Sequence, residues 1–381
     1  MIELYKNKEQ CCGCTACKNI CPRHAITMKS DEEGFLYPII DKDKCIKCKL
    51  CKKVCNFQKT INQDNELTNQ LVYAVKHKDE KIRRCSTSGG VFTAISDNIF
   101  DNNGIVYGAA YNSNMVVCHQ RANNKEERNK FRGSKYVQSD LKNTFKEVKE
   151  LLKEDKHVLF TGTPCQIDGL NSYLKNINSE KLITCDIVCH GVPSPLIFKN
   201  YIELSEQKNK DKIINYYCRD KVNGWHSHTE RAIYISGRQD YKSSTMQIYK
   251  TLFFSHNILR PSCHKCKYTN LNRCSDITIA DFWGIEKSLP EFDDNKGVSL
   301  VLVNSDKGRE MFGNIKKDIN YKVSGTKECL QPQLQYPSRV ASTRDEFWED
   351  YKNKGFKFVA KKYGRYNVKN RLKFRIKGLL K

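Results

Sequence analysis

A cysteine run that occurs twice near the start of the chain restricts its fold more than any other feature. Residues 11–21 contain the spacing C-x2-C-x2-C-x3-C, and residues 45–55 repeat it. This compact spacing brings three thiolates to one [4Fe–4S] cluster, while the fourth cysteine of each run reaches the cluster of the other run. The repeat therefore predicts a module of two [4Fe–4S] clusters in residues 1–57, with a strand at residues 34–40 between the runs.

The crossed pattern assigns every cysteine of the two runs. The first cluster is expected to be held by Cys11, Cys14, Cys17 and Cys55. The second is expected to be held by Cys21, Cys45, Cys48 and Cys51. Zinc is the alternative, but zinc sites favour separate pairs of C-x2-C over triplets followed by a fourth cysteine. Cys12 is left over and is not expected to be a ligand. A module of this kind relays single electrons.

The whole-chain composition agrees with a metal-binding role for the thiols. The chain has 381 residues, 19 Cys and a formal charge of +23. The N-terminus shows no signal peptide, and no apolar run reaches the roughly 18 residues of a membrane-spanning helix. Cysteines in a reducing compartment bind metal or do chemistry more often than they form disulfides. We therefore expect a cytoplasmic protein.

The middle of the chain alternates strand-like and helix-like segments. Residues 58–70 are polar and aperiodic, which indicates a linker. Beyond them, the alternation predicts an α/β core, so the chain as a whole is expected to be an α+β multidomain protein. Two predicted strands end in Cys165 and Cys189. Ligands bind at the carboxyl ends of strands in such cores, so both cysteines are candidates for a site.

A third group of cysteines follows at residues 263–274. Its spacing is C-x2-C-x7-C, formed by Cys263, Cys266 and Cys274. Three ligands need a fourth, which Cys189 or Cys165 can supply. Spacing alone leaves the metal open, because His264 can complete a zinc site instead.

Several segments taken together resemble the coenzyme F420 hydrogenase/dehydrogenase beta-subunit family, in a bacterial form with an N-terminal two-cluster ferredoxin domain. The resemblance extends over about residues 1–310 and rests on the order of the motifs as much as on any one of them. The matching segments are Ser86–Gly90, Ser134–Ser139, Gly162–Gln166, Cys189–Gly191, the third cysteine group, Ala280–Gly284 and Gly297–Val303.

The resemblance implies two further cofactors. One is a third [4Fe–4S] cluster, held by Cys263, Cys266, Cys274 and Cys189, with Cys165 as the other candidate for the fourth position. The other is FAD in a flavin-binding core. On this model, the flavin phosphate is held by Ser88, Gly89 and Gly90, and further cofactor contacts come from Lys135 and Ser139. From spacing alone, Ser-Gly-Gly is more often an ordinary turn before a helix.

The resemblance also implies an activity. Family members oxidise or reduce the deazaflavin coenzyme F420 by hydride transfer, so the chain is expected to pass electrons between a hydride carrier and [4Fe–4S] clusters through FAD. A redox partner protein is implied, and no catalytic residue is assigned. Two alternatives remain open. One is a related reductase in surface polysaccharide biosynthesis. The other is an electron-transfer adaptor that has clusters but no flavin and no substrate of its own.

The expected domains follow the motifs: 1–57 for the two clusters, 71–190 for an α/β domain, 191–345 for a C-terminal domain with the third cysteine group, and 346–381 for a basic tail. Residues 351–381 contain twelve Lys or Arg and no acid. Apolar residues from Val368 to Leu380 fall on one helical face, so peripheral membrane contact is one prediction for this tail. Docking on its own domain is the other. No nucleic-acid partner is expected, because no recognition motif accompanies the charge.

Overall fold

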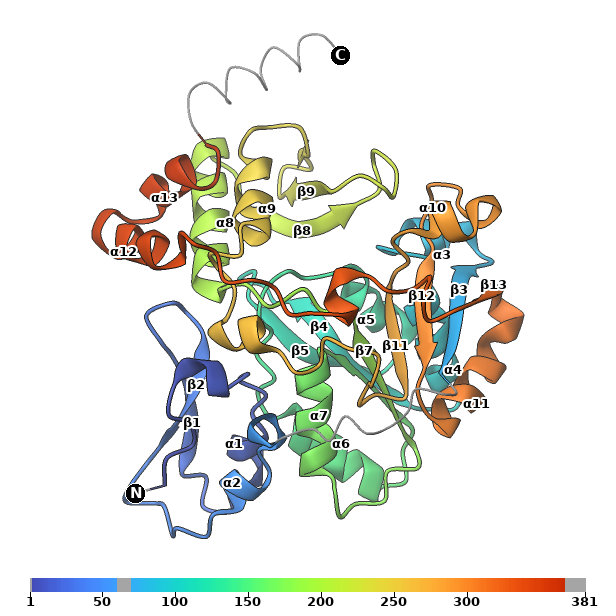
Figure 1. The fold of residues 1–381 in the computed structure, drawn as a ribbon, viewed down its shortest axis with the longest axis horizontal. Helices are drawn as coiled ribbons and strands as arrows, with labels where there is room; N and C mark the ends of the chain where they lie inside the picture. Colours follow the sequence, from blue (N-terminus) through green and yellow to red (C-terminus); the bar gives the residue numbers. More distant parts are fainter. Residues whose placement is uncertain (1, 60–69, 367–381) are drawn as a thin grey trace.

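The N-terminal cysteine runs lie in a small module at one side of the molecule (Figure 1). The computed structural model describes residues 2–59 and 70–366. In the module, β1 (Ile26–Ser30) pairs antiparallel with β2 (Leu36–Ile40). The short helices α1 (Ala16–Ile20) and α2 (Leu50–Lys53) contain the third cysteine of each triplet, Cys17 and Cys51. The strand predicted between the runs is confirmed as β2.

The core is a mixed sheet of eight strands in the order β13-β3-β12-β11-β7-β6-β4-β5. Neighbours from β4 to β11 run parallel in the order β4-β6-β7-β11, whereas the other pairs are antiparallel. The strands are β3 (Leu71–His77), β4 (Ile105–Tyr111), β5 (Val117–Ala122), β6 (Val158–Gly162), β7 (Leu182–Ile187), β11 (Ile277–Asp281), β12 (Ser299–Val303) and β13 (Ile319–Ser324).

Helices cover both faces of this sheet. One face packs on α4 (Val91–Asp101) and α11 (Asp306–Ile315), and the other packs on α6 (Thr144–Lys153) and α7 (Pro164–Tyr173). The buried strands are rich in β-branched and aromatic residues, as expected for strands covered on two faces. Short helices complete the connections: α3 (Glu80–Arg84), α5 (Lys125–Arg128) and α10 (Ile285–Ser288).

A second unit packs beside the sheet (Figure 1). Its three-stranded sheet has the order β10-β9-β8, from β8 (Ile213–Asp220), β9 (Thr229–Tyr234) and β10 (Gln239–Asp240). The helices around it, α8 (Pro195–Asn209), α9 (Met246–Phe254), α12 (Arg344–Lys354) and α13 (Phe356–Lys362), share one apolar core with it.

The large sheet takes strands from both sides of residue 190, since β11, β12 and β13 pair with β7 and β3. The domain boundaries drawn from the sequence stay predictions. The apolar face predicted for the basic tail begins at Val368 and lies outside the described residues. None of the described helices has the length and apolar character to cross a membrane.

Candidate metal centres

The first two cysteine groups are built from loops with the same unusual backbone. In each triplet, the residues on both sides of the middle cysteine have a positive φ: Gly13 and Thr15 around Cys14, and Lys47 and Lys49 around Cys48, with φ between 56° and 73°. Non-glycine residues rarely adopt this conformation, and such strain concentrates at functional sites. The repeat seen in the sequence is therefore a repeat of loop shape.

The predicted ligands of the first cluster face one another. Burial raises the pKa of the Cys17 thiol, and the neighbouring charges of Cys14, Cys11 and Cys55 raise it further. The same burial and the charges of Cys14 and Cys11 raise the pKa of Cys55 to about 11. Burial also raises the pKa of Cys11, whereas interaction with Cys12 lowers the pKa of Cys14. Three of the four thiols therefore disfavour ionisation and need a cation, such as the iron of a cluster, to become ligands.

The predicted ligands of the second cluster line one small cavity. Cys21, Cys45, Cys48 and Cys51 surround it, together with apolar neighbours. Burial raises the pKa of Cys51, and the charges of Cys48 and Cys21 add to that effect.

The spacing of the sulfurs separates clusters from single zinc ions. Across residues 2–59 and 70–366, no three cysteine sulfurs lie within 4.8 Å of one another. A tetrahedral zinc site, with Zn–S bonds of about 2.3 Å, holds its sulfurs about 3.8 Å apart. The described thiols are therefore less tightly grouped than a single zinc ion would hold them.

A buried cation beside the first group supports an anionic cofactor there. Arg260 is fully buried. It donates to the carbonyl oxygen of Cys11 at 2.8 Å, to Gln138 Oε1 at 2.9 Å and to the carbonyl of Leu36 at 3.1 Å. Its guanidinium also lies 4.1 Å from the ring centroid of Tyr37. No carboxylate of the described residues pairs with it, and an uncompensated buried charge is costly. A cluster held by four thiolates carries the compensating negative charge.

The third group brings five cysteines to the carboxyl ends of β6 and β7. Burial raises the pKa of the thiols of Cys189, Cys263, Cys266 and Cys274, and in each case the charge of Cys165 contributes. Cys165 therefore faces all four. Cys189 or Cys165 was predicted to be the fourth ligand of the third group. Both cysteines lie close to the C-x2-C-x7-C run.

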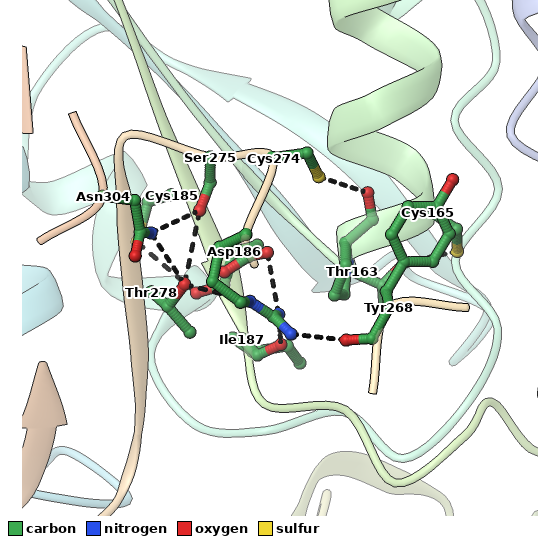
Figure 2. Close-up of polar contacts among 12 residues, drawn as sticks. Thr163, Cys165, Cys185, Asp186, Ile187, Tyr268, Cys274, Ser275, Thr278 and Asn304 are labelled. Atoms are coloured by element: carbon green, nitrogen blue, oxygen red, sulfur yellow. Dashed lines mark hydrogen bonds and ion pairs between the residues drawn. The ribbon is translucent and has the colours of Figure 1, made fainter. Parts of the chain in front are cut away.

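Backbone contacts hold this third group in place. Cys274 Sγ donates to the carbonyl oxygen of Pro164 at 3.3 Å, at the start of α7 (Figure 2). The amide of Val192 donates to Cys263 Sγ at 3.4 Å. The segments that carry Cys165, Cys189 and the C-x2-C-x7-C run thus meet in one place.

A buried ion pair anchors the loop before Cys274. Arg273 lies 2.8 Å from the carboxylate of Asp186 in β7, and both side chains are almost completely buried (Figure 2). Arg273 also donates to the carbonyl oxygens of Tyr268 at 2.6 Å and Ile187 at 3.1 Å. This pair was not predicted from the sequence, although a lone Asp in an apolar strand and an Arg next to a predicted ligand are its visible signals.

Cys12 joins the first and third groups. Its thiol is buried, and interactions with the thiols of Cys14 and Cys165, together with burial, raise its pKa, so it lies close to both. Helix α7 brings the groups together, because a Cβ on Gly169 would lie only 2.8 Å from Cys14 Sγ. The cysteine that the spacing left without a role is thus the contact between the two groups.

The predicted flavin-binding residues are largely engaged by the protein. Ser88 Oγ donates to the carbonyl of Val298 at 2.7 Å, and the Gly89 amide donates to Ser299 Oγ at 2.9 Å. Gly90 has φ 93° and precedes α4 without a side-chain cap, so amide groups at this helix start are available to a phosphate.

Lys135 and Ser139, the other two predicted cofactor contacts, lie in different surroundings from each other. Lys135 Nζ donates to the carbonyls of Lys130 and Arg132, both at 2.8 Å, and burial lowers its pKa to about 7. Its neighbour Ser134 donates its amide to Thr87 Oγ1 at 3.1 Å, which places this loop beside the Ser86–Gly90 segment.

Ser139 instead pairs with His119 Nδ1 at 2.7 Å. Within residues 2–59 and 70–366, no side-chain hydrogen bond joins it to the other four predicted positions. The five positions therefore stay predictions, of which the geometry favours Gly90.

An aromatic shelf lies next to the Ser86–Gly90 segment. Trp283 stacks on Trp225 with ring centroids 5.1 Å apart and on His228 at 5.5 Å. The guanidinium of Arg219 lies 4.8 Å from the Trp283 centroid. Ser88 Oγ is 3.4 Å from the carbonyl of Ala280, three residues before Trp283. Two rings and a guanidinium thus pack against Trp283 close to the uncapped start of α4.

Comparisons with known proteins match two parts of the chain to family models. Residues 155–328 match the family model for the C terminus of the coenzyme F420 hydrogenase/dehydrogenase beta subunit. Residues 10–59 match the 4Fe–4S dicluster domain. A search of curated proteins finds no relative of the sequence. Among solved structures, a chain of the F420-reducing [NiFe] hydrogenase complex from Methanosarcina barkeri, determined for xenon derivatisation, is 18% identical. The alignment covers 78% of this chain and 93% of that chain, with a TM-score of 0.44.

Proposed function

We propose that this chain exchanges electrons between a hydride carrier and three [4Fe–4S] clusters through FAD. The chain belongs to the coenzyme F420 hydrogenase/dehydrogenase beta-subunit family and is an iron–sulfur electron-transfer oxidoreductase. The hydride carrier is coenzyme F420 or a similar reduced nicotinamide or deazaflavin. The observation that carries the proposal is the connection of the cysteine groups: Cys12 lies close to Cys14 of the first group and to Cys165 beside the third, and Arg260 lies beside the first.

When bound, the flavin converts a two-electron hydride step into single-electron steps, and each cluster exchanges one electron. The residues of the chain fix where this happens. The cysteine groups set the order of the clusters, with the third group next to the core and the first group between it and the second. Arg260 stabilises negative charge at the first group, so it favours the reduced state there.

Two features of the described structure support our proposal for the flavin site. The amide groups at the start of α4, beside Gly90, suit its phosphates, and the shelf of Trp283, His228 and Arg219 suits its ring. Lys221 supports this corner of the site, because its Nζ donates to the carbonyl oxygens of Ser88 at 2.6 Å and Arg83 at 2.9 Å. The third cysteine group lies at the carboxyl ends of the neighbouring strands.

The fourth ligand of the third cluster is a choice between Cys189 and Cys165. We propose Cys189, because Cys165 Sγ already lies 3.2 Å from Thr163 Oγ1 and interacts with the thiol of Cys12. Separate Cys189→Ser and Cys165→Ser variants test this. We expect the third cluster's EPR signal to be lost in Cys189→Ser and kept in Cys165→Ser. The opposite result would transfer the role to Cys165.

The function is tested by stopped-flow spectroscopy of the anaerobic holoprotein. We expect reduced F420 to bleach a flavin band and then the broad iron–sulfur absorbance. NADH and reduced ferredoxin serve as comparison donors. Bleaching by reduced ferredoxin alone, in a protein without extractable flavin, would contradict the proposal and identify an adaptor that has no substrate of its own.

A further inference from the structure

The outer loop of the ferredoxin module carries a ring of positive charge. Residues 41–53 include two aspartates and six lysines, all six exposed: Lys42, Lys44, Lys47, Lys49, Lys52 and Lys53. We refer to these six residues as the lysine rim. They lie in the same loop and short helix as Cys45, Cys48 and Cys51, which are predicted ligands of the second cluster.

The charge of the lysine rim is not neutralised within the described structure. Lys44 forms an ion pair with Asp41 at 3.3 Å, and both side chains are exposed. The ammonium groups of the other five have no carboxylate partner in residues 2–59 and 70–366. Exposed cations of this kind attract an anionic surface over distances of about a Debye length, roughly 8–10 Å.

The centre of the rim is apolar and contains a redox ligand. Ile46 is 61% exposed and Leu50 is 38% exposed. Both line the small cavity formed with Cys45, Cys48 and Cys51, and Cys48 is itself exposed. An apolar centre surrounded by a charged rim is the usual anatomy of a transient protein interface. At this interface, a partner would meet the second cluster directly.

The second group is also the one that points away from the core. Cys14 and Cys17 of the first group pack against the core that includes α6 and α7. The apolar cluster that contains Cys51 draws only on residues of the N-terminal module. In Figure 1, α2 and the β1–β2 hairpin lie on the side of the module that faces away from the large sheet. A partner can therefore approach the second cluster without contacting the sheet.

From this exposure, charge and apolar centre we propose that the lysine rim is the docking surface for a small acidic one-electron carrier protein. This inference rests on the proposed electron-transfer function and assigns the second cluster as the point of exchange. In each encounter, one electron passes between the redox group of the carrier and the second cluster, so that one is oxidised as the other is reduced. The carrier then leaves, because the contacts are mainly electrostatic.

The test compares two charge-reversal pairs in the full-length anaerobic holoprotein. Lys42→Glu/Lys53→Glu alters the rim at positions outside the strained loop. Lys327→Glu/Lys357→Glu makes the same change in charge at exposed lysines elsewhere in the chain. The probe is a reduced acidic two-cluster ferredoxin, mixed with each variant at about 50 mM and about 500 mM salt. Reduced methyl viologen serves as a small donor that needs no docking surface.

We expect the rim variant to accept electrons from ferredoxin at least tenfold more slowly at low salt, with a smaller difference at high salt. The control variant is expected to keep the wild-type rate, and methyl viologen is expected to reduce all three proteins. Equal ferredoxin rates in both variants would overturn the proposal. A second result would also overturn it. If the proteins sediment with phosphatidylserine vesicles in a rim-dependent way while the ferredoxin rate is unchanged, the rim binds a membrane.

The same proteins separate this inference from the proposed function. If no hydride donor reduces the wild type but the rim variant still loses ferredoxin-driven reduction, the hydride activity is wrong and the docking surface stands. If reduced F420 reduces all variants equally and ferredoxin does not distinguish them, the docking surface is wrong and the hydride activity stands.

Discussion

Arg260 links three parts of the molecule at the scale of a single side chain. It binds the carbonyl of Cys11 in the ferredoxin module and Gln138 of the core, and it immediately precedes η4 (Pro261–Lys265), which contains Cys263. Its charge acts on the thiols of Cys11 and Cys263. A guanidinium without a carboxylate partner favours the extra electron of a reduced cluster.

Replacing this charge should therefore change a potential. In Arg260→Met, we expect the reduction potential of the first cluster to fall by roughly 40–90 mV, which corresponds to about 1–2 kcal/mol for one charge in a partly screened interior. EPR-monitored redox titration measures this shift. Arg260→Lys keeps the charge and is the matched control, for which we expect a smaller shift. Equal potentials in wild type and Arg260→Met would contradict the role of the charge.

Glu230 gives a second prediction at this scale, about stability. The carboxyl is buried in β9, and burial raises its pKa from 4.5 to about 8. Between these two values, the unfolded chain has lost the proton that the folded protein still holds. The stability contribution of Glu230 therefore falls as pH rises through this window, and the loss is complete above about pH 8.

Glu230→Gln removes that titration. We expect the variant to gain stability over wild type as pH rises from about 5 to 8.5, by roughly 2–5 kcal/mol at the upper end. Anaerobic urea unfolding at several pH values measures the difference. A difference between the two proteins that does not depend on pH would show that Glu230 titrates in its ordinary range.

The residues that could be predicted from sequence are those with a fixed local spacing. The eight cysteines of the two runs have this property, because a cubane takes three thiolates from one short loop. Cys12 and Arg260 do not, because their roles arise only where chain segments about 150 and 250 residues apart meet. Cys165 and Cys189 are intermediate: the strand pattern placed both at one sheet edge, but spacing cannot choose between them.

Helix α7 is the element that couples the module to the core. It begins at Pro164 with a capping box formed by Thr163 and Gln166, so the position of Cys165 near its start is well defined. Three residues later, Asp168 accepts hydrogen bonds from Asn56 at 3.0 Å and from Tyr268 at 2.5 Å. One helix thus contacts the chain after the second cysteine run and the loop of the third group.

A substitution at Gly169 tests the close contact between α7 and Cys14. A Cβ there would lie 2.8 Å from Cys14 Sγ, so Gly169→Ala should displace a ligand of the first cluster. We expect weakened or lost EPR signals of that cluster, with iron content falling by up to about four per chain. Gly313→Ala in α11 is the matched control, because a Cβ there meets nothing within 4 Å. Full cluster content in Gly169→Ala would refute the close contact.

The main elements of the core were predictable, since β3, β4, β6 and β7 follow apolar runs with turn residues between them. Their partners were less predictable. β11 lies about 90 residues after β7 in the chain but pairs beside it, and β12 then pairs with both β11 and β3. Hydrophobic periodicity identifies a strand and leaves its neighbours open. This is why sequence boundaries near residue 190 do not follow the edges of the sheet.

At the scale of the whole molecule, the cysteine groups form a series from the surface to the core. The second group lies under the lysine rim, the first packs against α7, and the third meets it through Cys12 and Cys165. The hairpin of the module is held to the second unit as well, where Arg344 binds both carboxylate oxygens of Glu33. The module is therefore fixed in an orientation that keeps this series intact.

The net charge of +23 is distributed unevenly along the chain. Part of it forms the lysine rim. About half belongs to residues 351–381, of which residues 351–354 complete α12 and residues 356–362 form α13, which packs into the core of the second unit. A single number for the chain thus combines a docking surface, a helix packed on its own unit and a terminal segment.

We propose that one chain holds three [4Fe–4S] clusters. Iron and acid-labile sulfide per polypeptide, measured in anaerobically purified protein, test this most directly. Cys263→Ser is the companion variant. With three clusters, we expect about twelve irons and twelve sulfides in wild type and about eight of each in the variant. About eight of each in both proteins would contradict it, because the third cysteine group would then hold no cluster.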